Sequence, residues 1–222
     1  IAANVTLSGT GELLLEANND ILHTAGTIGG GTMTAIFDAD LDNSGEGLIS
    51  QTGGALQAAN ASFLAGEDIT FNQNNTVSTI SAESGGAFTF VNTGSVTVGN
   101  VDTAAGITTS GNVDVTAGSN LTISNAISAG NNGDITLAAG GILDIDAAVA
   151  SDTLGVISLS ANGDIDVGAA VSTDNTGTGI SISADDDASG AGTLTLSGTG
   201  TLLDTTGGNG DIEISTADFA IT

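Results

Sequence analysis

Aspartate side chains at a regular spacing are the residues of this sequence best suited to chemistry. Asp144 and Asp166 lie 22 positions apart, and Asp152 and Asp174 are separated by the same step. If this step is one turn of a repeating structure, each pair stacks at one strand spacing, where like charges repel unless solvent or a cation screens them. Oxygen-rich clusters of this kind suit calcium. A solvated acidic face is the simpler interpretation, and both stay open.

Two further segments carry a calcium signal. The run Asp185, Asp186 and Asp187 could hold calcium in a loop, although three adjacent carboxylates are more often hydrated surface. The string Gly207 to Asp211 (GGNGD) resembles the glycine-rich calcium repeat, but it is one residue short and occurs once. We therefore interpret it as a turn. No cofactor is required by these residues, and calcium is the one that they suggest.

Catalysis is poorly supported by the residue types present, and we expect no enzymatic activity. A glycosidase needs only two carboxylates, which Asp144 with Asp166, or Asp164 with Asp166, would supply. Sugar sites normally offer aromatic platforms, however, and the chain has neither Trp nor Tyr. The Arg and Lys that polysaccharide lyases commonly use as bases are also absent. His23 is the only imidazole, and the sequence gives it no clear partner.

The charge of the chain excludes whole classes of partner. Its 222 residues contain 26 Asp and Glu and no Lys or Arg, a formal charge of −26. Phosphate recognition and attraction to anionic lipid both rest on Lys and Arg, so we expect neither nucleic acid nor membrane insertion. The hydrophobic fraction of 40% argues against disorder. With only six Phe among the aromatics, we expect a core of Ile, Leu, Val and Ala.

A short repeated phrase marks the elements that position these carboxylates. Gly and a small polar residue precede an apolar–polar–apolar triplet, as in Gly133 to Leu137 (GDITL), Gly163 to Val167 (GDIDV) and Gly210 to Ile214 (GDIEI). Each copy predicts a very short strand entered through a turn. Three rows of apolar residues share one 22-residue step: Val113, Ile135, Ile157; Leu121, Leu143, Ile165; Ile127, Val149, Val171.

Three strand rows with one step predict an all-β fold, a parallel β-helix (solenoid) with about three short strands per coil of about 22 residues. Dividing the length by the step gives roughly ten coils. We expect a single solenoid segment over residues 1–222, clearest over 86–215 and less regular over 16–85. An antiparallel sandwich is the main rival, and the common step argues against it.

The register is expected to continue beyond the clearest repeats. One extra residue leads to Ile180 and 22 more to Leu202, while Leu194 lies 23 beyond Val171. Asp185 to Asp187 fall where a second strand is due, so we expect an acidic loop there. Thr136, Ser158 and Ser181 would stack outward as a hydroxyl row of the kind that β-solenoid ice-binding proteins present, with Asp114 before it and Leu203 after it. Ordinary strand polarity is the alternative.

The repeat strings resemble the repeat regions of filamentous-haemagglutinin-like exoproteins and related bacterial surface adhesins. The strings are Gly133 to Val149 (GDITLAAGGILDIDAAV), Gly163 to Val171 (GDIDVGAAV) and Asn120 to Ile123 (NLTI), and the likeness covers about residues 86–215. It implies a secreted shaft with the fold of a right-handed parallel β-helix, at the bacterial cell surface or outside the cell. Because Lys and Arg are absent, the basic heparin-type patch of such proteins is not expected here.

These observations favour a structural role. We expect the shaft, or a self-assembling fibre subunit, of a cell-surface filament or adhesin, taken from a longer chain or complete as a filament subunit. Its partners would be copies of itself, stacked end to end or laterally, and a surface or glycan receptor. A cation-binding or ice-binding solenoid module is the alternative, and a carbohydrate-active enzyme is the third class.

Overall fold

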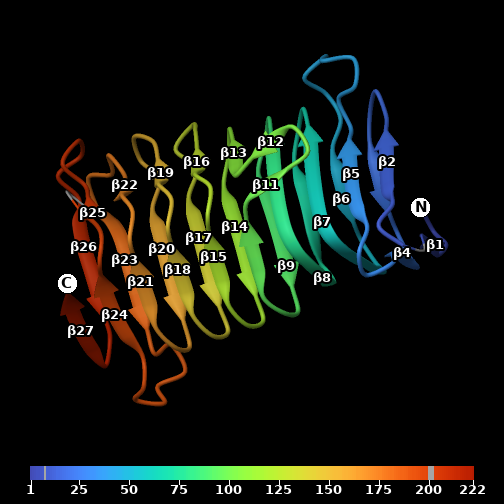
Figure 1. Cartoon of the computed structure of the whole chain (residues 1–222). Helices are drawn as coiled ribbons and strands as arrows, with labels where there is room; N and C mark the ends of the chain where they lie inside the picture. Colours follow the sequence, from blue (N-terminus) through green and yellow to red (C-terminus); the bar gives the residue numbers. More distant parts are fainter. Residues whose placement is uncertain (8, 200–202) are drawn as a thin grey trace.

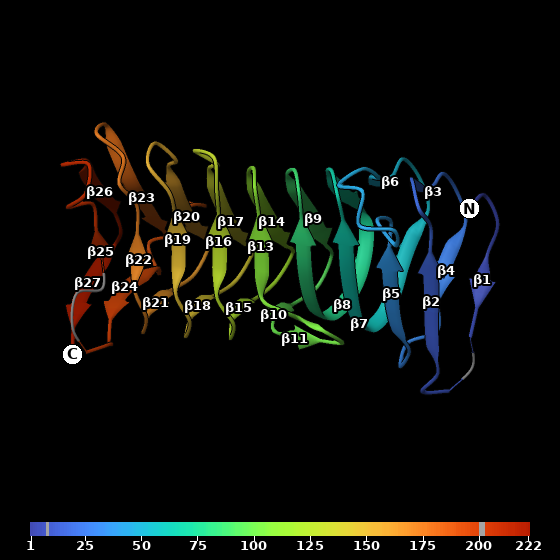
Figure 2. The same cartoon turned by 90° about the horizontal axis from the view of Figure 1, so that it is seen from above.

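The computed structural model describes residues 1–7, 9–199 and 203–222 as a parallel β-helix of about ten turns, with roughly 22 residues per turn. The coils follow one another along a rod, with the two termini at opposite ends (Figures 1 and 2). The described residues form strands, turns and bends, and none of them forms a helix that could span a membrane. The predicted fold class is confirmed.

Three ladders of parallel strands make up the walls of the coil. The first ladder contains β3 (Ile21–His23), β6 (Ile49–Gln51), the start of β8 (Ile69–Ser84), β9 (Phe88–Asn92), β14 (Val113–Ala117), β17 (Ile135–Ala139), β20 (Ile157–Ala161), β23 (Thr178–Ala184) and β26 (Asp211–Ser215). The second contains β1 (Val5–Thr6), β4 (Thr27–Gly29), the start of β7 (Ala55–Ala65), the middle of β8, β10 (Val96–Val98), β15 (Leu121–Ile123), β18 (Leu143–Ile145), β21 (Ile165–Val167), β24 (Thr193–Leu196) and β27 (Asp218–Ile221). The third contains β2 (Glu12–Glu16), β5 (Thr34–Asp38), the ends of β7 and β8, β13 (Ile107–Thr109), β16 (Ile127–Ala129), β19 (Val149–Ser151), β22 (Val171–Ser172) and β25 (Leu203–Asp204).

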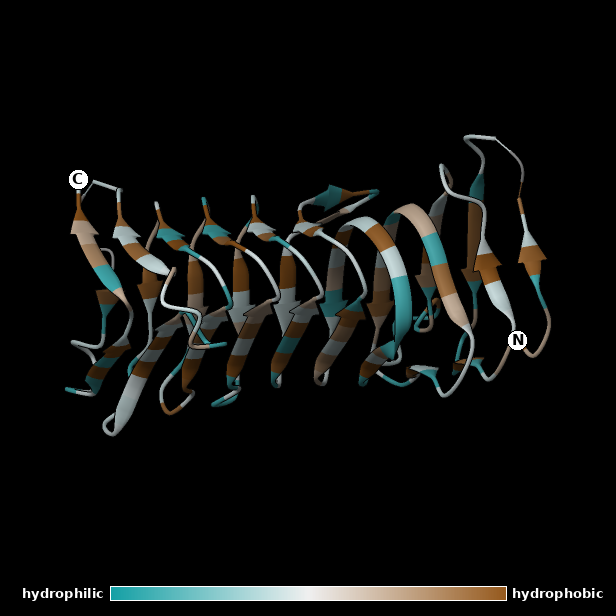
Figure 3. Cartoon of the chain, turned by 90° about the horizontal axis from the view of Figure 1, so that it is seen from below, coloured by the Kyte–Doolittle hydropathy of each residue, from teal (hydrophilic) through white to brown (hydrophobic). Residues whose placement is uncertain are grey.

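The apolar residue of each strand points into the coil and stacks on its equivalent in the next turn. Ile135 pairs with Ile157 and Leu143 with Ile165, and all four are fully buried. The strands therefore show bands of apolar and polar residues in Figure 3, as the two-residue period of a strand requires. The three predicted rows and their 22-residue step are confirmed over β14 to β22.

The register predicted beyond β22 is confirmed at Ile180, which pairs with Ile157 after one extra residue, and is wrong after that position. Leu194 stacks on Ile165 rather than on Val171, whose partner is Leu203. Ile180 is followed by Ile212, and the predicted position Leu202 lies outside the described residues. The physical cause is the loop between β23 and β24, which lengthens this turn so that a constant step no longer finds the next strand. The acidic loop predicted at Asp185 to Asp187 is confirmed.

The first coils are also wound around the same core, but with uneven steps. Ile21, Ile49 and Ile69 occupy successive positions of the first ladder at intervals of 28 and 20 residues. In this part β7 and β8 run without a break from one wall into the next, as the curved ribbons of Figure 2 show. The irregularity expected before residue 86 is therefore a change in turn length and not a break in the coil.

The core consists mainly of Ile, Leu, Val and Ala, as predicted, and in these early coils it also contains phenylalanine. Five of the six Phe are fully buried and in mutual contact: Phe37, Phe63, Phe71, Phe88 and Phe90. The rings of Phe37 and Phe63 stack with centroids 5.3 Å apart. The composition gives the number of these rings. Their contacts become visible only when coils of different length are aligned in the structure.

A row of polar side chains is buried beside the aromatic core. His23, Gln51, Asn75 and Asn92 follow one another at the end of the first ladder, and each is almost inaccessible to solvent. Gln51 and Asn75 exchange two amide hydrogen bonds of 2.8 and 3.0 Å, and the Nε2 of Gln51 lies 3.4 Å from the Nδ1 of His23. Every buried side-chain nitrogen and oxygen in the described part has a partner. His23 is thus part of an interior network that its sequence context did not reveal.

One antiparallel hairpin interrupts the coil. Strands β11 (Asn100–Val101) and β12 (Ala104–Ala105) pair with each other between β10 and β13 and project from the rod (Figures 1 and 2). The hairpin lies on the outer face of β7 and β8, where the hydroxyl of Ser81 donates a 3.1 Å hydrogen bond to the carbonyl of Val101. It forms a raised wall on an otherwise flat side of the rod.

Candidate functional site

The predicted carboxylate pair on the second ladder is in register. Asp144 of β18 is the direct neighbour of Asp166 of β21, and both point outward between buried residues. Burial, and then the charges of Asp146 and Asp166, raise the pKa of Asp144 above its ordinary value. The Oδ1 of Asp166 accepts a 2.7 Å hydrogen bond from the hydroxyl of Ser197. The stack therefore concentrates negative charge, as predicted.

The second predicted pair lies in a shallow hollow at the end of the third ladder. Asp152 and Asp174 line this hollow together with the hydroxyl groups of Ser128, Ser151, Ser172 and Thr173. One oxygen of Asp152 already accepts the backbone N–H of Asn132. The turn at Gly207 and Gly208 presses against Asp174, and a Cβ on Gly208 would lie 1.8 Å from its carbonyl oxygen. The interpretation of this string as a turn is confirmed for residues 207–209, and Asp211 begins β26.

The three acidic residues of the loop after β23 do not converge. Asp185 accepts hydrogen bonds from the Ser189 hydroxyl (2.9 Å) and the Gly190 N–H (2.8 Å), which lower its pKa. Asp186 accepts the hydroxyl of Ser183, and Asp187 accepts the N–H of Ser189. The three carboxylates therefore accept hydrogen bonds from the loop and from the end of β23.

A second loop repeats this arrangement. Between β5 and β6, Asp40 accepts the Ser44 hydroxyl (3.2 Å) and the Gly45 N–H (3.1 Å). Both loops read Asp-x-Asp-x-Ser-Gly-x-Gly, from residue 40 and from residue 185. In both, the residue before Ser and the Gly after it have positive φ. The shared motif is thus a turn that closes on its own first carboxylate, at two different corners of the coil.

No three metal-binding side chains meet within the part of the chain that the structure describes. The seven predicted metal ligands are divided among the stacked pair, the hollow and the loop, so calcium binding stays a prediction. In the alternative glycosidase pair, Asp164 and Asp166, one carboxylate already has a structural partner. The Oδ1 of Asp164 accepts a 2.8 Å hydrogen bond from the backbone N–H of Thr193. This bond ties one coil to the next.

The outward hydroxyl row is longer than predicted, but it is not continuous. On the first ladder the row runs through Ser50, Thr70, Thr89, Asp114, Thr136, Ser158 and Ser181. Glu213 follows Ser181, in place of the predicted Leu203. Burial raises the pKa of Asp114, the charged member of the row. Because a carboxylate divides the row, ordinary strand polarity explains it as well as ice binding does.

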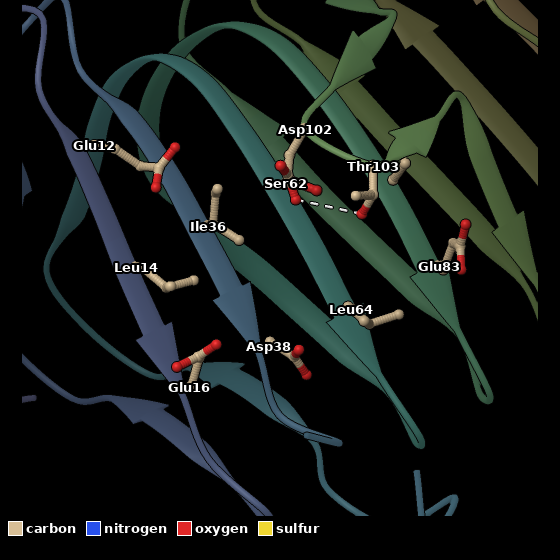
Figure 4. Close-up of a pocket in the computed structure, with 11 residues that line it drawn as sticks. Glu12, Leu14, Glu16, Ile36, Asp38, Ser62, Leu64, Glu83, Asp102 and Thr103 are labelled. Carbon is tan, nitrogen blue, oxygen red and sulfur yellow. Dashed lines mark hydrogen bonds between the residues drawn. The ribbon is translucent and has the colours of Figure 1, made fainter. Parts of the chain in front are cut away.

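A groove on the third ladder was not predicted. It has a volume of about 330 Å³ and crosses β2, β5 and β7, with the tip of the β11–β12 hairpin at one end (Figure 4). Its floor carries Leu14 and Ile36, which are direct neighbours in register. Five carboxylates line it: Glu12, Glu16, Asp38, Glu83 and Asp102. We call this site the acidic groove.

The groove left only a weak signal in the sequence. In the string Glu12 to Glu16 (ELLLE), every second residue of a strand shares a face, so Leu14 lies between Glu12 and Glu16 on the outward face. The contributions of β5, β7 and the hairpin could not be found, because the early coils have no constant step that would align them with β2.

Comparisons of the chain with protein-family models, with curated proteins and with solved structures give no match. The likeness to filamentous-haemagglutinin-like repeats therefore rests on the quoted strings, and the function is argued from the chain itself.

Proposed function

We propose that this chain is a structural protein, a β-helical shaft segment of a bacterial cell-surface or extracellular fibre that grows by stacking further coils on its ends. The observation that carries the proposal is the continuous stacking of equivalent strands in three parallel ladders, with rows of buried apolar side chains that run from coil to coil. Ile212, Ile214, Phe219 and Ile221 belong to β26 and β27 and are 40%, 40%, 51% and 74% exposed. Their equivalents one coil earlier, such as Ile180 and Ile182, are buried because β26 covers them.

One more coil would bury this apolar edge and pair its backbone. Unpaired strand edges with apolar side chains are templates for further strands, and burying each large side chain contributes about 1.5–3 kcal/mol. A following coil can come from a second copy or from a longer chain. We favour the second copy as the form to test, with a surface or glycan receptor as a further expected partner.

Electron microscopy of the purified chain at low salt, with and without millimolar calcium, tests this proposal. Regular fibres with an axial spacing of about 4.8 Å support self-stacking. The variant Ile214→Asp should abolish the fibres, because it places a charge in the edge. Leu154→Asp is the matched control, since Leu154 is 53% exposed in the loop between β19 and β20. Dispersed rods of the unmodified chain in both conditions would overturn self-stacking.

A further inference from the structure

The acidic groove combines an apolar floor with negative charge on both sides. Leu14 is 47% exposed and Leu64 of β7 is 37% exposed, and both line the same groove, so their apolar surfaces lie together. In Figure 4 both side chains point toward the same open space as Ile36. The floor therefore offers apolar surface to an incoming molecule.

The strand register fixes where the charges stand relative to this floor. Glu12 and Glu16 are two positions before and after Leu14 on β2, so each lies on the same face about 7 Å away along the strand. Asp38 is the direct neighbour of Glu16, and Glu83 is the neighbour of Leu64. One side of the groove thus carries a row of side chains across neighbouring strands. Its carboxylates lie on both sides of Leu64, in the order Glu16, Asp38, Leu64, Glu83.

The hairpin gives the groove a defined end. Ser62 and Ser81 continue the row of Leu14 and Ile36, but both are buried beneath the hairpin. At the hairpin tip, the hydroxyl of Thr103 donates to Asp102, whose carboxylate adds a further charge to the groove (Figure 4). The hairpin therefore bounds an occupant at this end of the groove.

No segment of this chain, and no second copy of it, carries side chains that complement the groove. Lys and Arg are absent, and the only imidazole, His23, is buried in the core. A bare divalent cation would neutralise charge but would leave Leu14 and Leu64 exposed to water. The complement in both respects is a molecule with positive charges on either side of an apolar group.

We propose that the acidic groove binds a cationic amphipathic peptide segment of a partner protein, with apolar side chains over Leu14 and Ile36 and Lys or Arg side chains beside Glu12 and the Glu16–Asp38 pair. The net charge of −26 attracts such a segment over a long range. The apolar floor then fixes it at this place rather than elsewhere on the rod. This binding is separate from the fibre role and does not depend on it.

Isothermal titration of the intact chain tests the proposal with a peptide of about seven residues, which carries Lys, Leu and Lys at every second position with Ser between them (the Lys–Leu peptide). In an extended conformation it spans roughly 23 Å and presents Lys, Leu and Lys on one face. We expect the double variant Glu16→Gln/Asp38→Asn to weaken binding about tenfold at an ionic strength of about 0.15 M, where distant surface charges are screened. Asp144→Asn/Asp166→Asn is the matched control, because it removes the same charge from another stacked pair. The control should change the dissociation constant less than about twofold.

The apolar part of the site is tested separately. Leu14→Ser should weaken binding of the Lys–Leu peptide, and a peptide of equal length and charge in which Ser replaces Leu should bind more weakly to the unmodified chain. The proposal is overturned if both double variants lose the same affinity, or if the Lys–Ser peptide binds as well as the Lys–Leu peptide. Circular dichroism confirms that each variant keeps the fold, and Leu14 is exposed enough to tolerate Ser.

Discussion

The Oδ1 of Asp134 accepts a 2.8 Å hydrogen bond from the backbone N–H of Val156, one coil further along the chain. Asn112 makes the same link to Asp134, and Asn120 makes it to Ile142, each across 22 residues. These side chains stand at corners, where the strand ladders are interrupted and backbone N–H groups need another acceptor. The small polar residue of the repeated phrase therefore links one coil to the next through a hydrogen bond from its side chain to the backbone.

Removing one of these hydrogen bonds between coils should destabilise the rod locally. We expect Asp134→Ala to lower the free energy of unfolding by about 1 kcal/mol, measured by urea denaturation, because the N–H of Val156 loses its acceptor. Asp134→Asn should keep most of the stability, since an amide oxygen can accept the same bond. Asp146→Ala is the control, as Asp146 is exposed and accepts no hydrogen bond within the described residues. Equal losses of unfolding free energy in Asp134→Ala and in the control would contradict this role of Asp134.

The aromatic core should dominate the stability of the early coils. Phe63 contacts four other rings, with centroids 4.8 to 5.9 Å away. Phe63→Ala should cost about 3–5 kcal/mol through lost contacts and a cavity. Hydrogen exchange should show the loss in β5 to β9, because each coil contacts only its neighbours. Phe219→Ala should cost under about 1 kcal/mol in the isolated chain, since Phe219 is exposed; a similar cost for both would count against the aromatic core.

His23 should make stability depend on pH. Burial lowers the pKa of His23 below its ordinary value, and protonating Nδ1 would set an N–H against the amide of Gln51. The unfolded chain takes up this proton first as the pH falls below about 6.5, so the free energy of unfolding should decrease there. Denaturation between pH 7 and 5 should show this decrease for the unmodified chain and a smaller one for His23→Gln. The same slope in both would exclude His23 as the cause.

The stacked carboxylates should destabilise the fold at neutral pH. The pKa of Asp144 is raised, which means that its charged form is disfavoured in the folded state. Asp144→Asn should therefore raise the free energy of unfolding by about 0.2–1 kcal/mol at low salt, and sodium chloride should reduce the gain. Glu213→Gln serves as the control, because Glu213 faces Ser181 and not another carboxylate. A gain that salt leaves unchanged would point to a cause other than charge.

The calcium hypothesis can be decided by calorimetry. Specific sites predict stoichiometric uptake that Asp144→Asn/Asp166→Asn or Asp152→Asn/Asp174→Asn reduces by whole ions. A solvated acidic face predicts weak heats that salt suppresses and that all variants share. We expect the second result, since Asp152 and Asp185 already accept hydrogen bonds from backbone N–H groups of the chain. Chelators should leave the loop at Asp185 unchanged, because Ser189 and Gly190 hold it.

Sequence reasoning succeeded where the chain repeats itself. The pairing of Asp144 with Asp166 and the burial of Ile135 and Ile157 follow from a period of two within each strand and a constant step between coils. It failed where the step changes. The prediction for Leu194 names the wrong neighbour because a loop lengthens one turn. Nothing in the local sequence shows how many residues the loop adds between equivalent strands.

The sequence by itself determined the class of fold, because alternation and the 22-residue step act between residues that are close along the chain or equally spaced. Tertiary structure alone decided which unequal segments meet. Phe37, Phe63 and Phe88 form one core, and Leu14 and Ile36 form one groove floor, only after coils of different length have closed around the same axis. The length at which each coil closes depends on how all of its side chains pack, and the spacing of residues along the chain does not predict it.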